Sequence, residues 1–215
     1  MTFLSSKINS DYHTQNTMRQ KIKRSIRVSR YIIYKETLVD HREHFWSFLS
    51  SFVGIGLIAY LGSQWLGMND NLFLIGSFGA SSVLVYGSIQ SPLAQPRNLV
   101  GGHVVSALIG VTVHKFIPDM VWLAAPLAVS LSIVFMQITK TVHPPGGATA
   151  LIAVIGSEKV RVLGYMYVLS PVLSGSLILL FVALIFNNIT SHRQYPTNER
   201  YTRMIRRLIR RKDEE

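Results

Sequence analysis

The sequence predicts an all-α protein that crosses a membrane several times. Only 15% of its 215 residues are charged and 48% are hydrophobic, whereas about 25% of the residues in a typical soluble domain are charged. The charges are also segregated. Residues 1–44 contain 9 Lys/Arg and residues 189–215 contain 8, but the much longer stretch between them contains only 5. A soluble domain needs a charged outer face, so the central stretch is expected to lie in lipid.

The charge pattern divides the chain into three parts. These are a basic N-terminal tail at residues 1–44, a membrane domain at 45–188 and a basic C-terminal tail at 189–215. Because Lys and Arg stay on the cytoplasmic side, we expect both termini in the cytoplasm and the domain in the plasma or inner membrane. An organellar membrane is the less favoured alternative. The tails would contact anionic lipids, and no module for nucleic-acid binding is visible.

Six apolar segments can be marked in the membrane domain, at Phe45–Leu66, Leu72–Ile89, Leu99–Phe116, Met120–Ile138, Ala148–Ile155 and Val162–Phe186. A membrane-spanning helix needs about 20 residues. The first and sixth segments meet this length easily, and the third and fourth are adequate. The second is interrupted by three glycines and the fifth is too short. We therefore expect long helices with a short or broken second and fifth segment.

The six segments resemble two sets of three. The stretch "GASSVLVYG" (Gly79–Gly87) aligns with "GATALIAVIG" (Gly147–Gly156) at an offset of 68 residues, and the same offset places the first segment over the fourth and the third over the sixth. Three crossings per unit would make the two repeats inverted relative to one another. Four spans with two re-entrant segments remain the alternative. The basic residues between the segments favour six crossings only slightly.

The stretch "HPPGG" interrupts the hydrophobic sequence just before the fifth segment. Proline restricts the residue before it to extended conformations but is well tolerated in the first turn of a helix. A helix can therefore begin at about Pro145, with unpaired N–H groups on the residues that follow. The residues with these N–H groups are Gly146, Gly147, Ala148 and Thr149. Free N–H groups at the positive end of a helix dipole form an anion site.

The second segment repeats this pattern at Gly79, Ala80 and Ser81. If the repeats are inverted, two half-helix N-termini approach the middle of the membrane from opposite sides, an arrangement that suits a small anion. The alternative is purely structural, because small residues also allow helices to pack closely. Residue spacing alone does not choose between these two interpretations.

Four polar side chains near the third and fifth segments are further candidates for the site: Gln95, Arg97, His103 and His143. An ionisable residue within a membrane segment suggests a functional site, and His143 could carry a proton, bind an anion or cap the following helix. Arg97 could attract an anion or instead snorkel to lipid headgroups. His103 could equally be a satisfied interfacial histidine.

The residue types argue against an enzyme. The acids of the membrane domain are Asp70, Asp119 and Glu158, all at expected loop ends, so no carboxylate pair is available for acid/base hydrolysis. No group of residues has metal-ligand spacing, and the chain has no cysteine. We expect no cofactor and no bound metal.

Three stretches resemble the HPP family of integral membrane proteins: "FGASSVLVYG" (Phe78–Gly87), "SPLAQPRNLVGGH" (Ser91–His103) and "TVHPPGGATAL" (Thr141–Leu151). The resemblance covers roughly residues 45–187. It implies a membrane domain usually described with four spans. It also implies nitrite transport, with which members from cyanobacteria and chloroplasts are associated. It supports the positions of the candidate site and does not fix the substrate.

We therefore predict transport of a small inorganic anion, with nitrite as the best candidate, bound at half-helix N-termini near the middle of the membrane. The candidate binding residues are Gly79, Ala80, Ser81, Gln95, Arg97, His103, His143, Pro144, Pro145, Gly146, Gly147 and Thr149. One alternative is a membrane enzyme acting on lipid or phosphate. Another is a scaffold or sensor that acts through its basic tails. The small size of the chain is compatible with a homodimer.

Overall fold

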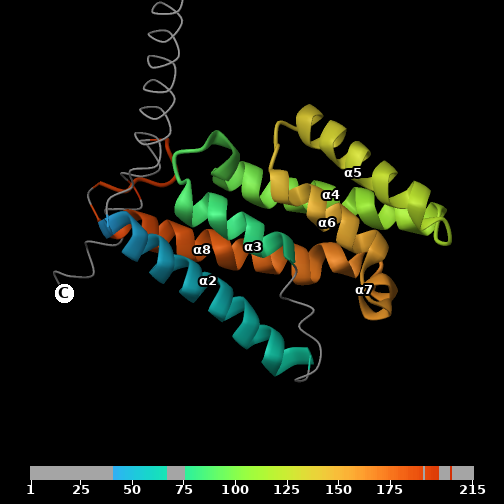
Figure 1. Cartoon of the computed structure of the whole chain (residues 1–215), viewed down its shortest axis with the longest axis horizontal. Coiled ribbons are helices and arrows are strands. Elements are labelled where there is room, and N and C mark those ends of the chain that lie inside the picture. Colours follow the sequence, from blue (N-terminus) through green and yellow to red (C-terminus); the bar gives the residue numbers. More distant parts are fainter. Residues whose placement is uncertain (1–40, 67–75, 191, 199–203, 205–215) are drawn as a thin grey trace, which may run out of the picture. The chain divides into compact units, whose positions relative to one another are not determined.

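A computed structural model describes residues 41–66, 76–190, 192–198 and 204. Contacts divide the chain into two units, Met1–Glu43 and His44–Glu215, and the description below concerns the second unit (Figure 1). The predicted N-terminal tail falls mostly outside the described residues, as does much of the C-terminal tail. Asp70 and the beginning of the second apolar segment also lie outside them.

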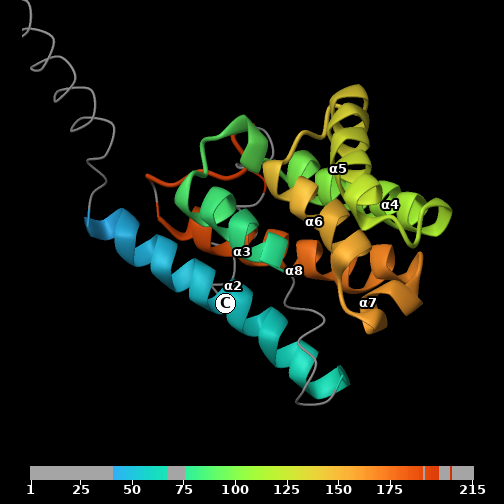
Figure 2. The same cartoon turned by 45° about the vertical axis from the view of Figure 1, so that its right-hand side comes forward.

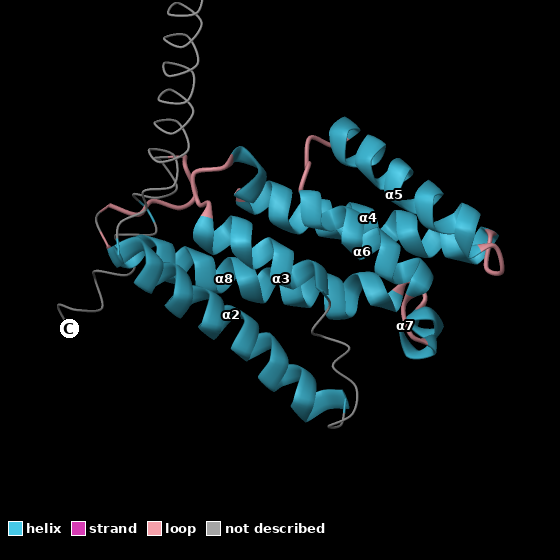
Figure 3. Cartoon of the chain, in the orientation of Figure 1, coloured by secondary structure: helices cyan, strands magenta, loops and turns pink. Residues whose placement is uncertain are grey.

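The described part of the chain consists of helices and connecting loops (Figure 3). The α-helices are α2 (His41–Leu66), α3 (Gly76–Ser82), α4 (Pro96–Phe116), α5 (Val121–Ile138), α6 (Pro144–Ile155), α7 (Glu158–Leu163) and α8 (Ser174–Ile189). A π-helical turn, Val83–Gly87, extends α3, and another, Val168–Leu173, leads into α8. A short 3-10 turn, Pro92–Ala94, precedes α4.

Among the described residues, 4 helices are long and apolar enough to cross a membrane. They are His41–Ser63, Pro96–Phe116, Val121–Ile138 and Val168–Ile189. The predicted all-α, multi-span fold is thereby confirmed. Helix α6 has 12 residues and is about 18 Å long at the usual helical rise, and the α-helical part of the second segment, α3, has 7. The second and fifth apolar segments therefore form short helices, as expected.

Hydrogen bonds between segments show which helix ends lie together, and so in which direction α3 and α6 run. The Ser47 hydroxyl near the start of α2 donates to the Tyr86 carbonyl, 2.9 Å away, so the end of the α3 segment lies beside the beginning of α2. Arg97 at the start of α4 donates to the Thr139 carbonyl after α5, at 2.7 Å. Helices α3 and α6 consequently run in roughly opposite directions (Figures 1 and 2). This alternation matches the predicted inverted arrangement of the two halves.

Helices α4 and α6 run side by side in very close contact. A Cβ added to Gly102 would lie 2.5 Å from the Cβ of His143, and one added to Gly110 would lie 2.5 Å from the Ala150 carbonyl oxygen. A Cβ on Gly146 would lie 2.7 Å from the Ser106 Oγ. Small residues therefore bring the two backbones together, as they do in other membrane helix pairs.

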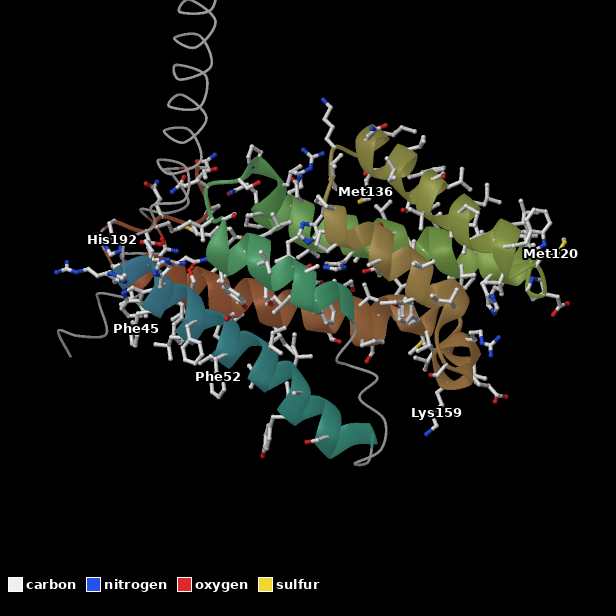
Figure 4. The ribbon with its side chains drawn as sticks, viewed as in Figure 1. Phe45, Phe52, Met120, Met136, Lys159 and His192 are labelled. Carbon is white, nitrogen blue, oxygen red and sulfur yellow. The ribbon has the colours of Figure 1, made fainter. Side chains whose placement is uncertain are left out.

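The outward-facing side chains are apolar, which suits a lipid environment. Phe45 and Phe52 on α2 point away from the bundle (Figure 4) and are 58% and 66% exposed. Met136 on α5 is instead only 2% exposed. His192 lies at one end of the bundle and Lys159 at the other (Figure 4). The polar ends and apolar middle are those expected of a membrane domain.

Candidate functional site

A cluster of five polar side chains lies inside the helical bundle, where α3 and α6 meet α4. It consists of Ser77, Ser81, His103, His143 and Thr149, and each of these residues is 0% exposed. His103 is seven residues after the beginning of α4, which places it about 10 Å along that helix. The cluster is therefore buried between the helices, about two turns into α4 from the end at which that helix begins.

Ser81 joins the two histidines. Its Oγ lies 2.7 Å from the Nε2 of His103 and 2.9 Å from the Nε2 of His143. The same hydroxyl is placed to donate to the Ser77 carbonyl at 3.0 Å. Because α3 carries Ser81 between α4 and the start of α6, the cluster exists only when all three helices are packed together.

Thr149 holds the other side of His103. Its Oγ1 lies 2.7 Å from the His103 Nδ1 and donates to the Ser77 Oγ at 2.9 Å. The Tyr167 hydroxyl donates to the Thr149 carbonyl at 3.3 Å. Both ring nitrogens of His103 are thus bonded, so its position and orientation are fixed.

His143 is fixed by a backbone partner. Its Nδ1 lies 2.9 Å from the Leu93 carbonyl in the 3-10 turn before α4. The centroids of the two imidazole rings are 5.0 Å apart, and the Phe78 ring lies edge-on to His103 at 5.3 Å. The imidazole pair is the chemically versatile part of the cluster, because a neutral imidazole donates a hydrogen bond through one ring nitrogen and accepts one through the other.

The backbone at the start of α6 differs from the prediction. The helix begins at Pro144, one residue earlier than expected, and the Gly146 N–H donates to the His143 carbonyl at 2.8 Å. The expectation of a free Gly146 N–H is therefore wrong. The two prolines have no N–H to offer, and Gly146 is instead the residue that lets α6 approach α4. Side chains, more than backbone N–H groups, make this site polar.

The structure places the α3 candidates on two different faces. Ser81 is buried in the cluster, whereas Gly79 and Ala80 are exposed, and an added Cβ at Gly79 would meet nothing within 4 Å. Residues two apart on a helix point in different directions, whereas residues four apart share a face. Ser77 therefore joins Ser81, and Gly79 and Ala80 lie away from the cluster.

The remaining α6 candidates surround the cluster to different degrees. Pro145 is buried beside it, Pro144 is exposed and Gly147 is partly buried. An added Cβ at Gly147 would have the Val129 side chain at 3.8 Å as its nearest neighbour, which is ordinary van der Waals contact. A Cβ at Gly147 would therefore fit without a clash.

Gln95 and Arg97 lie in the turn that enters α4, outside the cluster. The Gln95 Nε2 donates to the carbonyls of Ile89 and Ser91, at 3.1 and 2.9 Å, and its Oε1 accepts the Thr197 N–H at 2.9 Å. Arg97 is exposed and holds the chain after α5. Both side chains organise one end of the bundle in this structure.

Sequence reasoning missed two members of the site, Ser77 and Tyr167. The i, i+4 spacing of Ser77 and Ser81 could have revealed the first, since such residues lie on one helix face. Nothing in the sequence indicated that Tyr167 would contact Thr149. The 68-residue offset, in contrast, pairs Ser81 with Thr149, and the structure shows these two aligned residues on the two nitrogens of His103.

The two histidines lack the companions of a typical metal site. The described residues contain no group of three or more His, Asp or Glu side chains that could hold a metal ion. The partners of both imidazoles are instead hydroxyls, a backbone carbonyl and one another. Such partners suit proton exchange and the binding of small hydrogen-bonding solutes.

Comparison with known proteins gives the family. The family described as "HPP, transmembrane region" matches residues 36–196. A transmembrane protein of Dictyostelium discoideum is 49% identical over 160 residues, which cover 73% of this chain and 51% of that protein. A second transmembrane protein of the same organism is 45% identical over 160 residues, covering 73% and 56% respectively.

The chain spans about half the length of these two curated relatives. No solved structure matches it. Because the family match includes all four of the described helices that could cross a membrane, the chain belongs to the HPP family of multi-pass integral membrane proteins.

Proposed function

We propose that the protein transports a small inorganic anion across a membrane, with nitrite as the best candidate. One observation carries this proposal: five fully buried polar side chains meet between two short helices, inside a bundle whose outer surface is apolar. Burying polar groups within a membrane domain is costly, so they usually mark a substrate or ion pathway. A purely structural bundle would be expected to use apolar packing there.

The arrangement of the short helices supports transport. Inverted repeats with short or broken helices, and with the substrate site near the middle of the membrane, are typical of secondary transporters. Here Ser81 of α3 and Thr149 of α6 flank His103 from the two repeated halves. A movement of one half relative to the other would alter the contact between His103 and Thr149 and the contact between Ser81 and His143, because each joins a residue of one half to a residue of the other.

The chemistry of the cluster supports a small anion. Ser81, Thr149 and the imidazole N–H groups are hydrogen-bond donors, and the structure records no carboxylate in contact with the cluster among the described residues. An anion replacing one internal hydrogen bond would find donors without meeting negative charge. The choice of nitrite rests on the resemblance to HPP members associated with nitrite transport.

The placement in the cell is part of this proposal. The start of α2 and the end of α8 lie at the same end of the bundle, as the contacts of Arg193 with Tyr86 and Ser47 require. Both basic tails would then face the cytoplasm and contact anionic lipids there. We place the protein in the plasma or inner membrane, and we propose that two copies could associate through their apolar outer surfaces.

Reconstitution tests the proposal directly. The purified full chain in liposomes should take up nitrite down its gradient faster than protein-free liposomes do. Nitrate, formate and chloride, tested in parallel, would define the selectivity for small anions. Uptake no greater than that of protein-free liposomes for all four ions would refute the transport function.

A membrane hydrolase is the second candidate, because a serine hydroxyl within hydrogen-bond reach of an imidazole is the core of a nucleophilic pair. Ser81 satisfies this distance twice. It is nevertheless completely buried. Treatment with a fluorophosphonate probe separates the two functions, since only a hydrolase would form an adduct on Ser81.

A further inference from the structure

We propose that Ser81, His103 and His143 form a binding site for one proton, which is transported together with the anion. This inference rests on the proposed transport function and adds the coupling ion to it. It comes from counting the hydrogens available to a chain of polar groups linked by hydrogen bonds. The network is defined as Leu93 carbonyl, His143, Ser81, His103, Thr149 and Ser77.

One end of the network has a fixed direction. The Leu93 carbonyl oxygen can only accept, so the His143 Nδ1, 2.9 Å away, must carry a hydrogen and donate it. The neutral imidazole has only one N–H. In a neutral His143, therefore, the Nε2 that faces Ser81 carries a lone pair and needs a donor.

The other end joins two hydroxyls, those of Thr149 and Ser77, so its direction can reverse, and we first take the arrangement in which Thr149 is the donor. The Thr149 hydroxyl donates to the Ser77 Oγ and has no second hydrogen. The His103 Nδ1, 2.7 Å from the Thr149 Oγ1, must then be the donor of that bond. In a neutral His103, the Nε2 that faces Ser81 would carry a lone pair as well.

Ser81 therefore stands between two nitrogen acceptors with a single hydrogen to donate. The His103 Nε2, at 2.7 Å, and the His143 Nε2, at 2.9 Å, compete for that hydrogen, and the Ser77 carbonyl at 3.0 Å is a third acceptor, so one hydrogen cannot serve them all. One additional proton on the His143 Nε2 removes the shortage. His143 then donates to Ser81, Ser81 donates to His103, and every bond in the network has one donor and one acceptor.

The network also has a complete arrangement without the additional proton. If Ser77 donates to Thr149, each following bond reverses: Thr149 donates to His103, His103 to Ser81, and Ser81 to the unprotonated Nε2 of His143. The two arrangements differ by one proton and by the direction of four hydrogen bonds. The heavy atoms need not move, which makes the cluster well suited to bind and release a proton.

The added proton would create a positive charge that this chain does not balance. The neighbours that contact the imidazole rings are Phe78 of α3, the hydroxyls of Ser81 and Thr149, and the Leu93 carbonyl. The Tyr167 hydroxyl, an uncharged phenol, donates to the Thr149 carbonyl. The described residues thus supply no recorded negative charge to either imidazole.

An unbalanced charge in a buried site is strongly disfavoured. The proton is therefore expected to bind only together with an anion, and the pair crosses the membrane with no net charge. For nitrite the balance is one NO2⁻ and one H⁺ taken from water on one side and released to water on the other. No bond of the anion breaks.

The coupling can be measured in liposomes that contain the full-length protein and a pH-sensitive dye. An inward nitrite gradient should acidify the interior, with about one proton taken up per nitrite ion after subtraction of the nitrous acid that diffuses into protein-free liposomes. A membrane potential set with potassium and valinomycin should leave the nitrite uptake unchanged. Nitrite uptake that is voltage-driven and leaves the internal pH unchanged would overturn the coupling but not the transport function.

Variants locate the proton. His143→Gln should lose the nitrite-driven acidification, and Ser81→Ala should lose it as well because the bridge between the rings is gone. His114→Gln is the matched control, since His114 lies on the same helix as His103 and outside the network. Ser81→Ala keeps the test decisive if the His143 variant fails to fold. Acidification of wild-type size in either folded variant would refute the proton site. The absence of uptake of any anion by the wild-type protein would refute the transport function itself.

Discussion

Replacing Thr149 with valine tests whether the buried network stabilises the fold. Valine has nearly the shape of threonine but no hydroxyl, so the change removes the bonds to His103 and Ser77 without leaving a hole. A buried hydrogen-bonding group left without a partner costs roughly 1–3 kcal/mol. The His103 Nδ1 loses its only recorded partner in this change, so we expect a loss of about 2 kcal/mol.

Thermal unfolding in detergent, followed by tryptophan fluorescence, measures this loss. For a chain of this size a change of 1 kcal/mol corresponds to about 2–4 °C in the unfolding midpoint, so Thr149→Val should unfold roughly 4–8 °C below the wild type. Thr112→Val is the matched control. The Thr112 hydroxyl is on the exposed side of α4, where it donates to the Leu108 carbonyl one turn earlier and lies 3.1 Å from the Tyr165 hydroxyl. Equal midpoints for the two variants would refute the reasoning.

Three further predictions concern packing, topology and pH. Gly102→Ala should lower the unfolding midpoint and abolish transport, because the added Cβ would lie 2.5 Å from the Cβ of the buried His143. Gly79→Ala should leave the midpoint and transport unchanged, because its added Cβ would have no neighbour within 4 Å. Because the chain has no cysteine, Lys159→Cys and His192→Cys can each be labelled selectively with an impermeant maleimide. The two cysteines should react from opposite sides of the membrane. Labelling from the same side would contradict the arrangement in Figure 4. Tyr195 donates to a buried carbonyl before α4 at 2.8 Å, and burial raises the pKa of its phenol. The stability that this group contributes is therefore present below the ordinary tyrosine pKa of about 10 and is lost as the pH rises beyond it. The difference in midpoint between wild type and Tyr195→Phe should accordingly stay constant from weakly acidic to weakly alkaline pH, and a change across that range would contradict the assignment.

The candidate site was partly predictable because its strongest signals are local in the sequence. His103 and His143 are ionisable residues beside apolar segments, and the 68-residue offset relates Ser81 to Thr149. All four belong to the buried cluster. Gly79 and Ala80 were chosen by the same local similarity and lie on the exposed face of α3. A repeat identifies equivalent positions along the chain, but it does not give the rotation of each helix about its axis.

The sequence by itself determined the class of the protein, the long and short apolar segments and the family. These properties depend on composition, on the length of apolar runs and on the positions of proline and glycine, all of which can be read without knowing the contacts. Only the tertiary structure decided that Gly146 serves close packing, and that Ser77 and Tyr167 join the site. Hydrogen bonds between residues 22 to 72 positions apart depend on how three helices are packed and rotated, and the sum of many contacts sets that geometry.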